Sequence, residues 1–319
     1  MIEAAVVGLP FATAVLLALT LSWRTGAAIN AASAGLQFAT ACLLAWRSRA
    51  GPADLALLTA LVAMTTSWFG WRDIAASLAA RLISRRRTRR YHVGFQALIG
   101  AIQAATLADN LMLSWLALSV AVAAAAVVVA ASRRPAAIQA ASHLVRQCAI
   151  GLQLALLGVL LLEFAPDAAG LFLLAGYGAL AGLVPLHSWL LPTAEQSVAP
   201  AAIILTLLAN VPIVLFMRLQ LPPGLLMAFG FASFLPAAIA LHAKVDRPRT
   251  VALAGTAQLG MMAIAVGVGA RPVAWLHLTL LTLARSAVLQ SGGSNRPNWV
   301  HQPTANCGEK TENESVRTP

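Results

Sequence analysis

A few ionisable and amide side chains interrupt long apolar runs, and their chemistry stands out in this sequence. His187 lies in the segment Val184-Pro-Leu-His-Ser-Trp-Leu-Leu-Pro192, between Pro185 and Pro192. A proline leaves a helical carbonyl without its backbone donor, and a membrane tolerates such a break where protein or water lines it. A histidine beside a broken helix is suited to a proton or ion station. The alternative is a structural kink whose histidine is hydrogen-bonded or lies at the membrane interface.

Glu195 and Asn210 are the next polar candidates along the chain. Glu195 lies in the segment 193–200, which we interpret as a short re-entrant or interfacial link. Its carboxylate either caps the N-terminus of a helix or carries protons. Asn210 stands two residues before Pro212 in an apolar run. Its amide either lines a polar path or hydrogen-bonds carbonyls that the proline leaves free.

His277 and Arg285 are eight residues apart in the last apolar run. Eight residues are a little over two helical turns, so the two side chains project from about the same face of a helix. An arginine at this place either lines a polar pathway or extends its charged end to the membrane interface. The five candidates for a proton path are therefore His187, Glu195, Asn210, His277 and Arg285, with helix breaks at Pro185, Pro192 and Pro212.

Enzyme and cofactor motifs are missing from the sequence. It contains no HExxH, no paired CxxC, no GxSxG and no Walker motif. Its three cysteines, Cys42, Cys148 and Cys307, lack the spacing of metal ligands. We therefore expect a transporter subunit with no catalytic residue, metal or cofactor of its own.

The composition indicates the class of protein that positions these side chains. Of the 319 residues, 59% are hydrophobic and only 10% are charged, against about 25% charged in soluble domains. So few charges cannot cover the surface of a soluble protein of this length. The sequence predicts an all-α, polytopic transmembrane helix bundle with broken helices.

About eleven apolar runs are long enough to cross a bilayer, which needs roughly 20 residues per helix. The first run is expected to be an uncleaved helix and not a signal peptide, because Glu3 occupies the region where a signal peptide carries basic residues. The predicted spans are 4–23, 27–46, 53–71, 93–108, 111–131, 148–165, 170–191, 200–219, 224–243, 251–269 and 273–290.

The basic residues predict the orientation of the bundle. Fourteen lysines and arginines lie in the odd-numbered loops between the predicted spans, and four lie in the even-numbered loops. The positive-inside rule then places the odd loops and the C-terminal tail in the cytoplasm, and the N-terminus outside. The basic segment 84–91 could bind nucleic acid or anionic lipid, but between two apolar spans it is expected to anchor the topology in the inner (cytoplasmic) membrane.

Three parts follow from these patterns. Residues 1–92 are predicted to form N-terminal transmembrane helices and a basic cytoplasmic loop, and residues 93–290 a transport core. Residues 291–319 are polar and lack apolar periodicity, so a disordered tail is expected there.

Three stretches together resemble the antiporter-like membrane subunits of respiratory complex I (NuoL-like) and of multi-subunit cation/proton antiporters. They are 181–192, with Pro-Leu-His-Ser-Trp-Leu-Leu-Pro, 246–269, with Ala257-Gln258 among glycines, and 275–294, with His277, Arg285 and Ser-Gly-Gly-Ser. A weaker match is Asp109-Asn-Leu-Met-Leu-Ser-Trp115. The likeness covers about residues 105–294 in the order of the family.

Within that family the sequence is most similar to the DabB-type membrane subunits of energy-coupled inorganic-carbon transporters. The motifs that favour this group are His187 to Leu191, Ala257-Gln258 and the Ser-Gly-Gly-Ser after Arg285. The resemblance implies a proton path along the middle of the membrane. It also implies uptake of carbon dioxide or bicarbonate with a partner, a large soluble zinc-containing DabA-type subunit.

The sequence also departs from the family. Leu180 and Ala181 stand where relatives commonly have a lysine, and Leu118-Ser119 replace a common carboxylate. Leu281 stands near the place of a second histidine, and Arg285 replaces a lysine, although arginine does not deprotonate usefully. Two alternatives therefore stay open. The chain is a proton-channel subunit of an NADH:quinone oxidoreductase or antiporter complex, or it is a degenerate scaffold that does not conduct.

Overall fold

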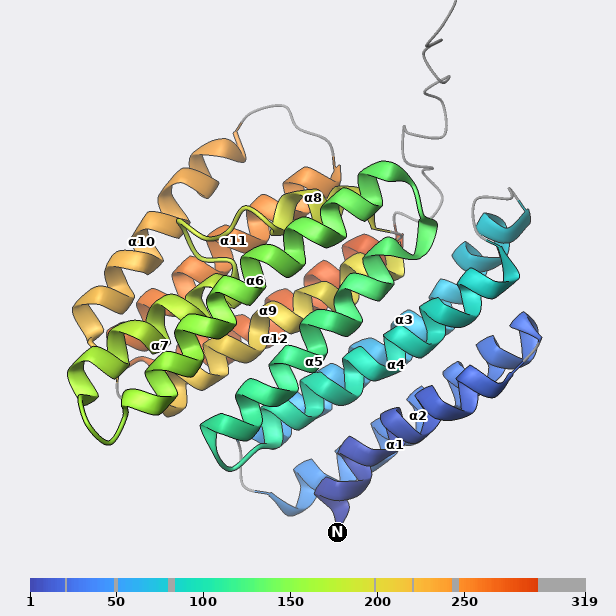
Figure 1. Cartoon of the computed structure of the whole chain (residues 1–319), viewed down its shortest axis with the longest axis horizontal. Helices are drawn as coiled ribbons and strands as arrows, with labels where there is room; N and C mark the ends of the chain where they lie inside the picture. Colours follow the sequence, from blue (N-terminus) through green and yellow to red (C-terminus); the bar gives the residue numbers. More distant parts are fainter. Residues whose placement is uncertain are drawn as a thin grey trace, which may run out of the picture.

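The computed structural model of the chain is an all-helical bundle, as the composition predicts (Figure 1). It describes residues 1–20, 22–48, 51–79, 84–197, 199–219, 221–242 and 247–291, and no strand occurs among them. The tail predicted over 291–319 falls, beyond Ser291, outside the described residues. Seven helices of the described part (α1, α2, α3, α5, α6, α10 and α11) are long and apolar enough to cross a membrane. The chain is a multi-pass membrane protein.

Eleven predicted spans correspond to twelve α-helices in the described residues, because one span is broken in two. The helices are α1 (Ile2–Leu19), α2 (Trp23–Arg47), α3 (Pro52–Ala79), α4 (Arg85–Leu107), α5 (Leu111–Val129), α6 (Pro135–Leu161), α7 (Pro166–Ala181), α8 (Leu190–Gln196), α9 (Ala199–Arg218), α10 (Pro223–Ala240), α11 (Arg247–Gly267) and α12 (Arg271–Ser291). A 3₁₀ turn, η1 (Ala130–Ser132), links α5 to α6.

Local sequence sets several helix ends. The side chain of Asn110 accepts a hydrogen bond from the backbone N–H of Leu113 at 2.8 Å and so caps α5. Helices α6, α7 and α10 each begin with a proline in the first turn, where the missing N–H costs nothing. Helix α7 ends at Gly182, whose φ of 75° is a left-handed conformation that favours glycine.

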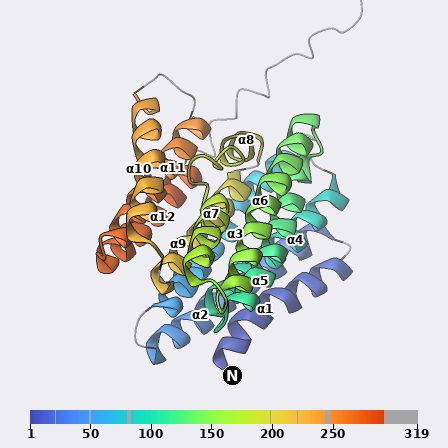
Figure 2. The ribbon, with the colours of Figure 1, turned by 60° about the vertical axis from the view of Figure 1, so that its left-hand side comes forward.

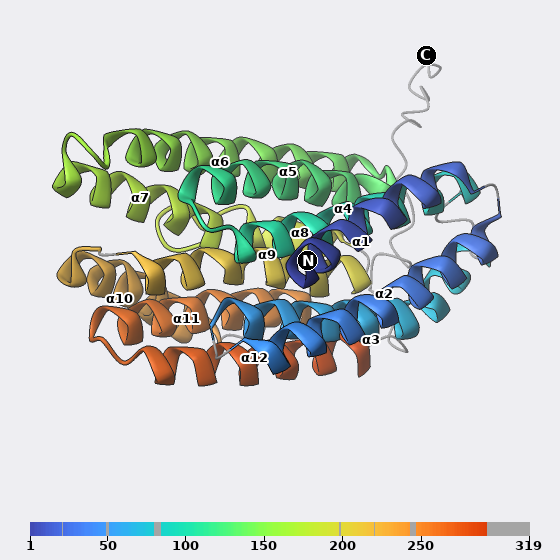
Figure 3. The same ribbon diagram turned by 90° about the horizontal axis from the view of Figure 1, so that it is seen from below.

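Helix α9 is central in the bundle. It contacts α3, α4, α5, α7, α11 and α12. In Figure 3, α5, α6 and α7 lie along one side and α10, α11 and α12 along the opposite side, with α9 between them. Figure 2 shows the short helix α8 near one end of the bundle, where it packs against α6 and α11. The helices that carry the candidate residues therefore meet around α9.

Two helix pairs approach closely through glycines. A Cβ on Gly176 of α7 would lie 2.4 Å from the backbone nitrogen of Ala155 in α6. A Cβ on Gly260 of α11 would lie 2.6 Å from the carbonyl oxygen of Gly230 in α10. Small residues let membrane helices pack backbone against backbone, where lipid provides no hydrophobic driving force between them. These contacts fix α6 against α7 and α10 against α11.

The outer surface suits a lipid environment. Large apolar side chains are exposed along most helices, among them Trp46, Phe69, Phe164, Leu235 and Ile239. An apolar surface this extensive would cause a soluble monomer to aggregate. It is the surface expected of a bundle that lies in a bilayer.

Helix ends differ from the predicted spans at three places. Helix α4 begins at Arg85, not at 93, and α6 begins at Pro135, not at 148. Both helices continue into basic or polar sequence because a backbone helix does not end where the apolar residues end. The link predicted at 193–200 is largely helical, since residues up to Gln196 form α8.

Candidate functional site

The break between α7 and α8 has its own hydrogen bonds. The backbone N–H groups of Gly182 and Leu183 donate to the carbonyls of Ala179 and Gly178 and close the end of α7. The N–H of Val184 donates to Ser233 Oγ of α10 at 2.8 Å. The fully buried Trp189 donates its indole Nε1–H to the carbonyl oxygen of Ala179 at 2.9 Å. The interruption predicted at Pro185 is thus fixed by hydrogen bonds of the fold. Pro192 instead lies within α8 and Pro212 within α9, so neither of these two prolines breaks a helix.

His187 lies in this break and is partly buried. Its Nδ1 is buried and has no hydrogen-bond partner in the described part of the chain. A buried imidazole nitrogen without a partner is unfavourable, and water in a polar pocket is its simplest partner. Among the described residues, Nδ1 is therefore not satisfied by the protein, as a hydrogen-bonded structural kink would require.

Glu195 lies on α8, in a separate place at one end of the bundle. It lines a cavity of about 570 Å³ between α6 and α8, with His143 and Arg146 among the other lining residues. Nearby, Arg134 Nη2 donates to the carbonyl oxygen of Gln196 at 3.2 Å. The carboxylate is at the C-terminal turn of α8, so it does not cap the N-terminus of this helix. Glu195 thus shares the lining of this cavity with two basic side chains.

Asn210 connects α9 to α12. Its Nδ2 donates to Thr282 Oγ1 at 2.8 Å, and the side chain is 1% exposed. Of the two interpretations of this amide, the bond to a hydroxyl on another helix fits a polar path better than a local repair of the carbonyls near Pro212. Its Oδ1 is buried without a partner among the described residues.

Arg285 is buried in the same region and does not extend to an interface. Its exposure is 7%, and its Nε donates to Gln258 Oε1 of α11 at 2.5 Å. Gly255 leaves room for the guanidinium, since a Cβ there would lie 3.2 Å from Nη1. His277, two turns earlier on α12, is partly buried with an unpartnered Nε2 in the described residues.

The candidates thus lie in three places and do not form one continuous chain. Asn210, His277 and Arg285 belong to a polar cluster of α9, α11 and α12, which also contains Gln258 and Thr282. Within the described residues, no hydrogen bond joins His187 or Glu195 to this cluster. Gln258 is a site residue that residue chemistry alone missed, and the signal for it was its place among glycines in the motif 253–262.

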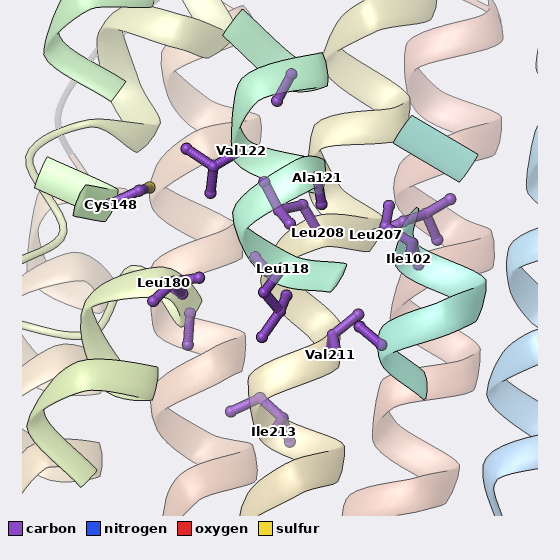
Figure 4. Packing of buried hydrophobic residues seen from close by; sticks show 14 of the residues in the cluster. Ile102, Leu118, Ala121, Val122, Cys148, Leu180, Leu207, Leu208, Val211 and Ile213 are labelled. Atoms are coloured by element: carbon purple, nitrogen blue, oxygen red, sulfur yellow. The ribbon is translucent and has the colours of Figure 1, made fainter. Parts of the chain in front are cut away.

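An apolar cluster occupies the opposite side of α9 (Figure 4). Leu118 of α5 and Leu180 of α7 are both fully buried in it, with Cys148 of α6. Leu207, Leu208 and Val211 of α9 complete the contact. These two leucines stand where the resemblance would place a carboxylate and a lysine. The described part of this region therefore presents no titratable side chain at either position.

A second polar group lies outside every sequence candidate. Amides and hydroxyls of α1, α2, α3 and α4 form a network around Gln96, which is fully buried. A residue-by-residue search for ionisable groups misses it because its hydrogen-bonded members are uncharged. The sequence does indicate one polar helix face here, because Asn30, Ser33 and Gln37 recur at helical spacing inside an otherwise apolar run.

Comparison with known proteins gives one curated relative and several solved structures. The chain is 27% identical over 275 residues to the hydrogenase-4 component F homolog of Methylacidiphilum infernorum (isolate V4). That match covers 73% of this chain and 58% of the relative, so the chain spans little more than half of the relative's length. No family model matches the sequence.

Three solved structures share the fold. A chain of the membrane-bound sulfane sulfur reductase, an archaeal respiratory membrane complex, matches with a TM-score of 0.79 and 13% identity, over 92% of this chain and 70% of its own. A chain of respiratory complex I from Thermus thermophilus, with bound aureothin, matches with a TM-score of 0.76 and 20% identity, over 91% and 69%. A chain of the Mrp complex from Dietzia sp. DQ12-45-1b matches with a TM-score of 0.78 and 15% identity, over 92% and 65%. The chain is therefore similar in sequence to the hydrogenase-4 component F homolog, and it shares its fold with chains of respiratory and Mrp membrane complexes.

Proposed function

We propose that the chain is a membrane subunit of a multi-subunit, proton-coupled complex of the antiporter-like kind, in the inner (cytoplasmic) membrane. The observation that carries this proposal is the broken helix α7–α8 with the unpartnered Nδ1 of His187, on a fold shared with chains of respiratory and Mrp complexes. Polar groups in a membrane interior are costly, so their presence there points to transport.

The proposed path uses the residues around α9. His187 supplies a titratable group at the helix break, and the Asn210–Thr282 and Arg285–Gln258 pairs supply a polar cluster with a buried positive charge. His277 lies on the same helix as Arg285 and takes or releases a proton near this charge. Glu195, at the mouth of its cavity, is proposed to connect the path to one membrane surface.

The apolar cluster limits what this path can be. Leu118 and Leu180 bring no proton carrier to the side of α9 that faces α5 and α7. A chain of protons cannot cross closely packed leucines without water. We therefore propose that conduction is confined to the α8–α12 side. This cluster is also the observation that favours the second candidate, a scaffold subunit that does not conduct.

The proposal has two alternatives for the complex that the chain joins. The motifs at 187–191 and 257–258 favour inorganic-carbon uptake with a zinc-containing DabA-type partner. The curated relative and the solved structures favour a respiratory or antiporter complex with other membrane subunits. In either complex, the role that we propose for the chain within the membrane is the same.

Affinity purification of the tagged native chain from its own membranes separates these complexes. Mass spectrometry of the purified material identifies the subunits that accompany it. A large soluble zinc protein supports carbon uptake, and rescue of growth in air in a carbonic-anhydrase-deficient host then tests it. Redox or antiporter subunits support the respiratory alternative. A chain that purifies with no other subunit under mild detergent contradicts the proposed membership in a complex.

A further inference from the structure

The network around Gln96 is an unbroken chain of hydrogen bonds across four helices. Thr13 of α1 bonds Ser33 of α2 at 2.5 Å, and Gln37 Nε2 donates both to Ser33 Oγ at 2.9 Å and to Gln96 Oε1 at 2.8 Å. Gln96 Nε2 donates to Asn30 Oδ1 at 2.9 Å, and Asn30 Nδ2 donates to Ser67 Oγ of α3 at 3.2 Å. All of these side chains come from the middle part of their helices.

These side chains do not satisfy one another. Within this chain of hydrogen bonds, Gln37 Oε1 is buried without a partner among the described residues. Outside it, Thr59 Oγ1 and Thr66 Oγ1 of α3 and Gln103 Oε1 of α4 are also buried without one. A buried polar atom without a partner loses its hydrogen bonds to water and is destabilising. A purely structural amide network would be expected to close its bonds, because partly satisfied networks are worse than apolar packing. Bound water is the simplest hydrogen-bond donor to these oxygens.

His92 extends this network toward one end of the bundle. It lies one helical turn before Gln96 on α4, is 3% exposed, and has no partner for either ring nitrogen in the described chain. Thr88, a further turn back, is 1% exposed, and its hydroxyl donates to the carbonyl oxygen of Ser84, the residue before α4, at 3.3 Å. Helix α4 thus carries Thr88, His92 and Gln96 on one buried face, which leads from its basic N-terminal turn to the centre of the network.

The network is separate from the path proposed around α9. Between α12 and the N-terminal helices, Gln290 Nε2 donates to Thr65 Oγ1 of α3 at 3.1 Å. Neither residue is a member of the Thr13–Ser67 chain. The hydrogen-bonded members are neutral amides and hydroxyls, which bind water without holding an ion.

We propose that the seam formed by His92, Gln96, Asn30, Gln37, Ser33 and Ser67 is a hydrated access path. It binds a row of water molecules that reaches from the N-terminal end of α4 to the middle of the bundle. The ligand class is water, held by amide and hydroxyl groups, and the seam brings water to the membrane interior outside the α8–α12 side. This inference does not rest on the identity of the complex.

Cysteine reactivity tests the seam, because a thiol reacts as its thiolate and the thiolate requires water. Ser67→Cys and Ser33→Cys keep the shape of the native side chains. Each is made in a background with Cys42→Ser and Cys307→Ser, in native membranes, and is treated with a small water-soluble methanethiosulfonate. Two controls are matched: the native Cys148, fully buried in the apolar cluster, and Ser114→Cys, a buried serine of α5 outside the seam.

We expect both seam cysteines to react about tenfold faster than Cys148 and Ser114→Cys, or more. Adding Gln96→Leu should remove polar partners for the water and return Ser67→Cys to the rate of the controls. Ser67→Cys reacting as slowly as Cys148 overturns the proposal, even if Ser33→Cys reacts fast, because water would then reach only the outer part of the seam. If Ser67→Cys does not accumulate, Asn30→Cys replaces it under the same criterion.

Discussion

At the scale of single residues, the polar pairs across α9, α11 and α12 are what distinguish this bundle from an apolar scaffold. The sequence predicted Arg285 and Asn210 as candidates, because charge and amide groups are rare in apolar runs. It could not predict their partners, Gln258 and Thr282, since these lie on other helices and come together only on folding. For Leu118 and Leu180, the sequence showed that they depart from the family. It could not show that both leucines are buried in the same apolar cluster.

Replacing Arg285 with leucine should leave the Gln258 amide without its partner. We expect a loss of about 1–3 kcal/mol in the free energy of unfolding, because an unpaired buried amide is costly. Thermal unfolding of the purified protein measures the loss. The double variant Arg285→Leu/Gln258→Leu should recover part of it, since neither polar group is then left alone.

Arg271→Leu is the matched control for this pair. Arg271 begins the same helix and is exposed, so its replacement should change stability little. A double variant as unstable as the sum of the two single variants would show that Arg285 and Gln258 do not interact.

At the scale of helices, apolar length predicted how many elements exist and which one is broken. The segment with Pro185 and Pro192 does divide into α7 and α8. Helix α4 shows what such a count cannot predict. Helix α4 carries His92, Gln96 and Gln103 inside the bundle, where neighbouring helices and not lipid surround them. In the sequence, such polar residues look like the water-exposed face of a surface helix.

The contact of α10 with α11 depends on glycine at position 260. Gly260→Ala places a Cβ 2.6 Å from the Gly230 carbonyl oxygen and 2.7 Å from the backbone nitrogen of Phe234, so the helices must separate. We expect a destabilisation of about 1–3 kcal/mol, seen as a lower Tm in detergent. Gly35→Ala is the matched control in α2. No atom lies within 4 Å of the new Cβ there, so stability should stay unchanged or rise slightly. Equal Tm values for both variants would contradict the close contact.

At the scale of the whole molecule, the apolar core surrounds α9, and the hydrogen-bonded polar cluster lies on one side of this helix. The side formed with α5, α6 and α7 is packed with leucine, valine and alanine (Figure 4). The side formed with α11 and α12 holds the buried arginine and its amide partner. Sequence composition established that the protein belongs in a membrane. It did not establish this asymmetry, which arises from how the helices meet in three dimensions.

Proton flux through the purified complex in proteoliposomes tests the central claim most directly. A pH-sensitive dye inside the vesicles reports the rate under an imposed membrane potential. We compare the wild type with the variants His187→Ala and His242→Ala. The native His242 follows α10 and is exposed, and its Nδ1 lies 3.0 Å from the carbonyl oxygen of Ala238. The account predicts wild-type flux well above empty vesicles, a fall to about a tenth or less in His187→Ala, and no change in His242→Ala. Wild-type flux equal to that of empty vesicles, or full flux in His187→Ala, would contradict it.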